Sequence, residues 1–176
     1  MRGLRGRRSI RLRGYDYTSP GAYFVTICTH RKRWIFGAIV DGKMSLALEG
    51  QIAKVAWMAI VTHFSEVETG PFVVMPNHVH GILILEGSPG KRRGAACRAP
   101  TSFGKPVAGS LETILRSFES AVTRGANHLR PVRQTVWQRG FFERVIRGEE
   151  EFARIAGYIE DNPRRWIEDQ YYTSED

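Results

Sequence analysis

The hydrophobic positions of this chain alternate between patterns typical of strands and patterns typical of helices, and the order of these segments predicts the fold. Segments dense in β-branched and apolar residues predict strands, whereas segments with apolar residues at helical spacing predict helices. Strands are expected over residues 23–31, 72–85 and 135–146, a hairpin over 39–46, and helices over 49–64, 111–129 and 149–162. This order predicts an α+β ferredoxin-like sandwich with an antiparallel sheet, in which the strand over 72–85 lies centrally and helices cover one face.

Two histidines stand two residues apart in the strand over 72–85, in the run Met75-Pro76-Asn77-His78-Val79-His80. Successive side chains of a strand point to opposite faces, so His78 and His80 share one face while Val79 points into the core. Residues at this spacing lie about 6.5 to 7 Å apart along a strand, which lets both rings converge on one cation. The alternative is a pair of partly buried histidines satisfied by hydrogen bonds.

A second motif lies on the expected last helix, which opens with three glutamates and ends near Asn162, before Pro163. Tyr158 lies beside the apolar stripe of this helix, and Asn162 follows it by four residues, so the phenol and the carboxamide are stacked on one flank. Both side chains can face one site. The alternative is an amphipathic tyrosine whose ring packs on the core and whose hydroxyl meets water.

Together these motifs resemble the single-tyrosine HUH transposases, and most closely the branch of REP-associated tyrosine transposases. The resemblance covers nearly the whole chain. The shared segments are Gly21-Ala22-Tyr23-Phe24-Val25-Thr26, Val74-Met75-Pro76-Asn77-His78-Val79-His80-Gly81, residues 117–123, Val136-Trp137-Gln138-Arg139, and Tyr158-Ile159 with Asn162-Pro163. In one respect the chain departs from the pattern: insertion-sequence members have Gln four residues after the tyrosine as third metal ligand, and this chain has Asn162.

The resemblance implies a ferredoxin-like fold and a metal-dependent transposase or endonuclease of single-stranded hairpin or repeat-element DNA. In that reading Tyr158 is the nucleophile of a 5′-phosphotyrosine intermediate, and His78, His80 and Asn162 hold the metal, with Asp161 as the rival for the third position. Two imidazoles, an amide and water suit Mg²⁺ or Mn²⁺. Arg154, one turn before Tyr158, is a candidate for lowering the pKa of the tyrosine, and the alternative is a structural arginine exposed to solvent. The resemblance also allows a homodimer.

Basic residues outnumber acidic ones 26 to 18, for a net charge of +8, which indicates a polyanionic partner. Two groups of them are clustered, one in an arm over residues 1–20, ahead of a domain over 21–167, and one in an expected mobile loop of that domain over 87–109. A polar tail follows over 168–176. In this tail we expect Tyr171 and Tyr172 to be loosely held. The predicted phosphate-binding residues are Arg5, Arg7, Arg8, Arg11, Arg13, Lys91, Arg92 and Arg93.

Several kinds of site and several classes of protein are not expected from this sequence. Cys28 and Cys97 form no Cys-x-x-Cys pair, so neither a disulfide framework nor a cysteine zinc site is predicted. Neither Gly-Lys pair is followed by Ser or Thr, so we expect no phosphate-binding P-loop and no ATP. The sequence has neither a secretory signal nor a run of about 20 apolar residues, so we expect no membrane partner and a cytoplasmic protein.

Two other functions fit the same patterns. One is a nonenzymatic nucleic-acid-binding module of ferredoxin-like fold that stacks bases on aromatic side chains. Its candidate residues are Tyr23, Phe24, Trp34, Phe36 and Trp137. The other is a metal-dependent phosphodiesterase that activates water, for which the histidine pair is essential and Tyr158 is not. Covalent attachment of DNA distinguishes the transposase from both.

Overall fold

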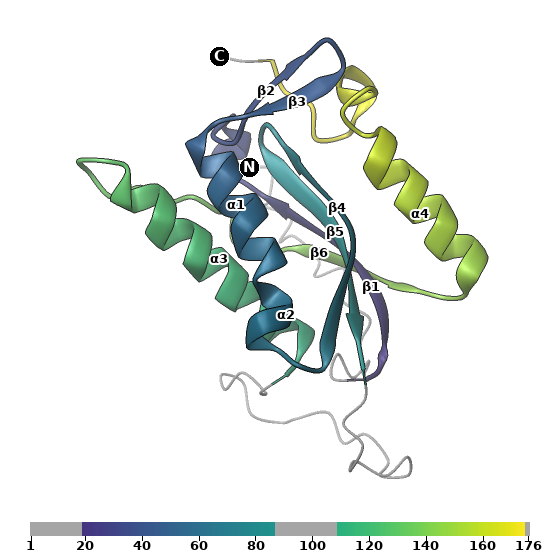
Figure 1. Cartoon of the computed structure of the whole chain (residues 1–176). Helices are drawn as coiled ribbons and strands as arrows, with labels where there is room; N and C mark the ends of the chain where they lie inside the picture. The colour runs from purple at the N-terminus through teal and green to yellow at the C-terminus, as the bar shows by residue number, and fades with distance from the viewer. Residues whose placement is uncertain (1–18, 87–108, 175–176) are drawn as a thin grey trace, which may run out of the picture.

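A four-stranded antiparallel sheet forms the centre of the protein (Figure 1). The computed structural model describes residues 19–86 and 109–174. The strands are β1 (Gly21–Cys28), β4 (Val67–Met75), β5 (His78–Leu85) and β6 (Phe142–Ile146), in the order β4-β5-β1-β6. Every neighbouring pair is antiparallel. The strand that carries the histidines is therefore central, as the sequence predicts.

Helices cover both faces of this sheet. On one face α1 (Leu48–Met58) and α3 (Leu111–His128) pack over the larger core, into which Val79 points. On the opposite face α4 (Glu149–Asp161) packs through Ile155 and Ile159 (Figure 1). The order β1-α1-β4-β5-α3-β6 is that of a ferredoxin-like sandwich, which confirms the predicted α+β class. The expectation that helices cover one face only is wrong, because α4 follows the sandwich and buries its own apolar stripe on the remaining face.

The predicted hairpin is present as β2 (Gly37–Val40) and β3 (Lys43–Leu46). Asp41 has φ 50° and Gly42 has φ 70°, and two central residues with positive φ are typical of the type I′ turn that joins antiparallel strands. Two short 3₁₀ helices, η1 (His30–Lys32) and η2 (Trp166–Glu168), complete the fold of the described residues.

Several predicted boundaries are wrong. The single strand expected over 72–85 is the hairpin of β4 and β5, in which Met75 pairs with His78 across a turn at Pro76 and Asn77. Apolar runs on both sides of this turn conceal the reversal, although Pro76 cannot donate to the ladder. The helix expected over 49–64 is divided at Ala59 into α1 and α2 (Ile60–His63). The first strand ends at Cys28, and the extended segment over 135–146 becomes regular only at Phe142, after an isolated bridge between Thr29 and Trp137.

Gly81 lets the end of the histidine motif approach α1 closely. The Trp57 ring lies where a Cβ at this glycine would be, and it stacks on Phe72 with 4.4 Å between ring centroids. A side chain at this position would displace an indole that is 2% exposed. The strand next to His80 is therefore held from the face opposite to the histidines.

Candidate active site

The two histidines meet on the face of the sheet that α4 covers. Nε2 of His78 lies 2.9 Å from Nε2 of His80, and both side chains are fully buried. Their other ring nitrogens have outer partners: His78 Nδ1 is 2.8 Å from Asn77 Oδ1, and His80 Nδ1 is 2.8 Å from Thr26 Oγ1. The predicted convergence of the two rings is present.

The orientation of Asn77 fixes the tautomer of His78. Its amide nitrogen donates to the backbone oxygen of Tyr171 (2.9 Å), so its Oδ1 faces the imidazole as an acceptor. His78 Nδ1 must then carry the proton, which leaves a lone pair on Nε2 in the neutral ring. Burial lowers the pKa of both histidines, of His78 strongly, with the neighbouring His80 adding to the effect. At neutral pH both rings are therefore in the uncharged form that binds metals.

Asp169 completes this group, and no pattern in the sequence points to it. Its Oδ2 lies 3.9 Å from His80 Nε2, and ligand atoms of His78, His80 and Asp169 all lie within 4.8 Å of one another. Burial raises the pKa of this carboxyl, but the nearby His80 ring and the hydrogen bonds from the backbone N–H of Tyr171 and from Asn162 outweigh it and hold the pKa below its usual range. The three residues form a site that could hold a metal ion.

Two further observations fit a cation here. The Nε2 atoms of His78 and His80, which share a hydrogen bond at 2.9 Å, are close enough for both to bind one ion in its place. Asn162 Oδ1 is a buried acceptor without a hydrogen-bond partner among the described residues, on a side chain that is 2% exposed. Its Nδ2 donates to Asp169 Oδ2 at 2.6 Å. Asp161, the rival, points away: its carboxylate is 47% exposed and lies 4.0 Å from Arg164.

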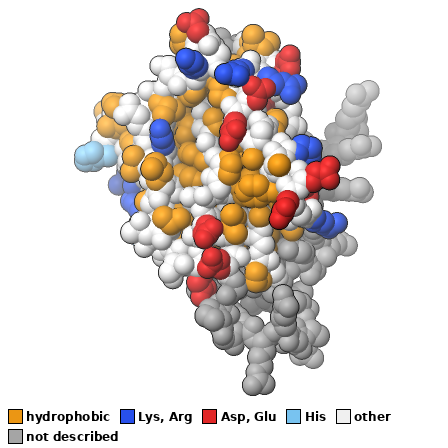
Figure 2. All heavy atoms as spheres, turned by 45° about the vertical axis from the view of Figure 1, so that its right-hand side comes forward, with side chains coloured by type: hydrophobic (Ala, Val, Ile, Leu, Met, Phe, Trp, Pro, Cys, Tyr) orange, Lys and Arg blue, Asp and Glu red, His pale blue; other side chains and the backbone are white. Residues whose placement is uncertain are grey.

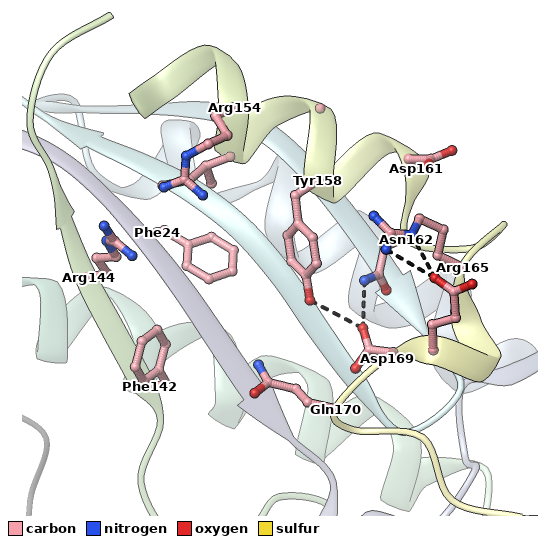
Figure 3. A pocket seen from close by; sticks show the side chains of 13 residues that line it. Phe24, Phe142, Arg144, Arg154, Tyr158, Asp161, Asn162, Arg165, Asp169 and Gln170 are labelled. Carbon is pink, nitrogen blue, oxygen red and sulfur yellow. Dashed lines mark hydrogen bonds and ion pairs between the residues drawn. The ribbon is translucent and has the colours of Figure 1, made fainter. Parts of the chain in front are cut away.

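Tyr158 extends from α4 to the same group (Figure 3). Its hydroxyl lies 3.2 Å from His80 Nε2 and donates to Asp169 Oδ2 at 3.2 Å. Burial, and then the negative charge of Asp169, raise the pKa of this tyrosine well above its ordinary value. Arg154, the candidate for lowering that pKa, is 64% exposed and lies 3.7 Å from Glu151, which fits the alternative of an exposed structural arginine. The phenol is therefore protonated at neutral pH, with a carboxylate placed to accept its proton.

The segment after α4 covers the histidines, contrary to the expectation of a loosely held tail. The Tyr171 ring lies 4.8 Å from the His78 ring and 5.6 Å from the His80 ring, between centroids. Tyr172 packs on Trp166 at 5.3 Å. Polar composition suggested solvent exposure, but two aromatic rings and the bond from Asn77 fix this segment. In the sequence, the two adjacent tyrosines, Tyr171 and Tyr172, were the feature that could have indicated an ordered segment.

A cavity of about 650 Å³ opens beside Tyr158, between α4 and the sheet (Figure 3). Phe24, Phe142 and Ile155 give it an apolar wall, and Tyr158, Asn162 and Asp169 line the side toward the histidines. Arg144 and Arg154 also line it, and Figure 3 shows their guanidinium groups near Phe24 and Phe142, away from Asp169. The nucleophile candidate is thus reached from an open pocket.

The predicted phosphate-binding residues lie outside the described residues. They are Arg5, Arg7, Arg8, Arg11, Arg13, Lys91, Arg92 and Arg93, and their role stays a prediction. Among the described residues, no helix is both long and apolar enough to cross a membrane.

Comparison with known proteins gives one relative in sequence and a likeness in structure. An uncharacterized protein of Haemophilus influenzae is 39% identical over 172 residues, which are 97% of this chain and 95% of the relative. A REP-associated tyrosine transposase, solved bound to a REP hairpin, superposes with a TM-score of 0.58 and 17% identity over 96% of this chain and 76% of that one. No family model matches. At 17% identity the likeness is evidence for the fold, and it confirms at that level the resemblance that the motifs indicated.

Proposed function

The chain belongs to the family of the Haemophilus influenzae protein and has the fold of the REP-associated tyrosine transposase, and on this basis we propose that it cleaves and rejoins single-stranded DNA through a covalent link to Tyr158. The observation that supports the proposal most strongly is the position of the Tyr158 hydroxyl. It lies 3.2 Å from both His80 Nε2 and Asp169 Oδ2, at the end of an open cavity. A nucleophile, a proton acceptor and a group of metal-binding atoms therefore meet at one point.

We propose Mg²⁺ or Mn²⁺ as the cofactor, held by His78, His80 and Asp169, with Asn162 Oδ1 as a further oxygen donor. Two nitrogens, one carboxylate and an amide oxygen leave positions for water and phosphate, which suits these ions. When bound, such a cation stabilises the negative charge that develops on the phosphate oxygens and favours the ionised phenol.

The chemical step needs the tyrosine to lose its proton as it attacks. The Tyr158 oxygen forms a bond to phosphorus, and the bond from phosphorus to the 3′ oxygen breaks. That oxygen leaves and takes a proton from water, which gives a 3′-hydroxyl. The Tyr158 proton leaves through its hydrogen bond to Asp169 and passes on to water, because the contacts that hold the Asp169 pKa below its usual range keep this carboxylate ionised. Attack by a 3′-hydroxyl on the 5′-phosphotyrosine reverses these steps and joins the strands. No added energy source is needed, because the phosphotyrosine ester conserves the energy of the phosphodiester bond that cleavage broke.

The DNA class is proposed from charge and from the related fold. The transposase of similar fold was solved bound to a REP hairpin. This chain has a net charge of +8, and two groups of its basic residues are clustered, one in the first 14 residues and one over residues 91–98. Clustered guanidinium groups neutralise phosphates without sequence preference. We therefore propose a single-stranded DNA hairpin as the partner.

Incubation of the protein with end-labelled hairpin DNA and Mn²⁺, followed by denaturing electrophoresis, tests the proposal. Wild type should give a protein-DNA adduct that survives denaturant, and Tyr158→Phe should give none while still binding the hairpin, because this change removes one oxygen and keeps the ring. Tyr172→Phe is the matched control, since Tyr172 packs on Trp166, and it should form the adduct.

The two alternatives predict other results. Cleavage without an adduct, retained in Tyr158→Phe, would favour a phosphodiesterase that activates water. Binding without cleavage would favour a nonenzymatic module. Of the aromatics proposed for such a module, Tyr23 and Phe36 are fully buried, Trp137 is 8% exposed, and all three belong to the core on the other face of the sheet.

A further inference from the structure

The cavity beside Tyr158 has a row of aromatic rings along its wall. The Phe24 ring lies between the others: its centroid is 6.2 Å from that of Tyr158 and 6.3 Å from that of Phe142, with interplanar angles of 80° and 69°. Phe24 is 9% exposed and belongs to the core. Phe142 is only partly buried, at the start of β6, which is an end strand of the described sheet. The row therefore leads from the nucleophile to an accessible ring at the sheet edge.

Positive charge lies at the same end of the cavity as Phe142. Arg144 is 2.5 Å and Arg154 is 3.7 Å from the same Glu151 oxygen, and their side chains are 54% and 64% exposed. Two guanidinium groups thus share one carboxylate, which leaves an excess positive charge at the rim. Figure 2, turned toward the α4 side, shows hydrophobic side chains gathered in the middle of this face, with acidic and basic side chains around them.

An apolar aromatic wall beside exposed guanidinium groups is the arrangement that binds single-stranded nucleic acid, because bases stack on the rings and phosphates meet the cations. The volume of about 650 Å³ lies within the range of about 300 to 1,000 Å³ of small-molecule pockets, so a single base fits. Phe142 offers a ring that is partly open, whereas Phe24 does not.

We propose that this cavity is a subsite for the nucleobase next to the scissile phosphate, and that the base stacks on Phe142 while Arg144 and Arg154 meet the flanking backbone phosphate. This inference rests on the proposed function, because it takes Tyr158 as the point of attack. Stacking is tolerant of base identity, so the subsite positions the strand without selecting a sequence.

Hairpin DNA with a single-stranded tail tests this subsite, with one fluorescent 2-aminopurine placed at each tail position in turn. The Tyr158→Phe protein is used so that the strand stays intact. At one position binding should quench the fluorescence through stacking. Adding Phe142→Leu, which keeps an apolar side chain but removes the ring, should abolish this quenching and weaken tail binding about fivefold or more.

Two matched variants separate stacking from folding. Phe142→Tyr keeps the ring and should keep the quenching. Phe152→Leu alters a neighbouring ring that packs against the same cluster but does not line the cavity, and it should also keep the quenching. Quenching that persists in Phe142→Leu, or that appears at no tail position, would overturn the subsite.

Failure of the subsite and failure of the proposed function give different results. If wild type forms the covalent adduct but quenching is independent of Phe142, the subsite is wrong and the tyrosine chemistry stands. If quenching depends on Phe142 but wild type forms no adduct, the base-binding cavity stands and the transposase proposal is wrong.

Discussion

The hydroxyl of Tyr158 lies 3.2 Å from Nε2 of His80, across 78 positions of sequence. One residue comes from the helix that follows the ferredoxin-like sandwich and the other from a central strand of its sheet. Their meeting depends on α4 packing against the sheet face that carries the histidines, through Ile155 and Ile159. The site is therefore a product of the added helix and not of the sandwich alone.

The histidine pair should bind Mn²⁺. Replacing His78 or His80 with Ala removes one nitrogen donor and should weaken binding by more than about tenfold, a loss at least as large as that typical for removing an outer partner of a ligand. Titration with Mn²⁺, followed by electron paramagnetic resonance of the free ion, measures this. His63→Ala, which changes an exposed histidine at the end of α2, should bind like wild type. Equal affinity in all three variants would remove the pair from the metal site.

Asp169 and Asn162 should differ in their effects on the same titration. Asp169→Asn keeps the shape and removes the charge, so Mn²⁺ affinity should fall about tenfold or more. Asn162→Gln keeps an amide oxygen and should be tolerated better than Asn162→Leu, because the oxygen is the proposed donor. If the Gln and Leu variants bind Mn²⁺ equally, Asn162 serves only as the hydrogen-bond partner of Asp169.

How much of this site was predictable differs from residue to residue. Strand alternation places His78 and His80 on one face, and helical spacing places Tyr158 and Asn162 on one flank, because both are local periods; that the two motifs form one site came from the resemblance to the transposases. Asp169 lies seven residues after Asn162, beyond α4, and a 3₁₀ turn sets its position. No sequence period extends through such a turn. The hairpin turn at Pro76 was missed for a different reason: apolar residues continue on both sides of it, so the two strands read as one. Local periodicity thus predicts elements and faces, while the positions of residues after irregular turns need the structure.

Glu119 should make stability depend on pH. Burial raises its pKa from 4.5 to about 7, although Arg116 opposes the shift. The folded protein therefore binds this proton more tightly than the unfolded chain, so the contribution to stability is full below pH 4.5 and is lost as pH rises toward 7. Free energies of unfolding, measured with denaturant at several pH values, should fall over this window for wild type relative to Glu119→Gln. Parallel curves would contradict the raised pKa.

The arginines of the first 14 residues should contribute affinity that depends on salt and not on sequence. A variant that lacks residues 2–14 should bind hairpin DNA more weakly. The slope of log affinity against log salt should become shallower by about 0.7 for each single-strand phosphate that the arm neutralises in wild type. Fluorescence anisotropy at several salt concentrations, on specific and scrambled hairpins, provides the slopes. An unchanged slope would show that this arm does not bind phosphate.

The most direct test of the central claim is to locate the covalent bond. Wild-type protein incubated with hairpin DNA and Mn²⁺ is denatured, treated with nuclease and protease, and the peptide that retains a nucleotide is identified by mass spectrometry. The account predicts a phosphodiester on Tyr158, in a peptide from α4. A nucleotide on Tyr171 or Tyr172, or cleaved DNA with no modified peptide, would contradict it.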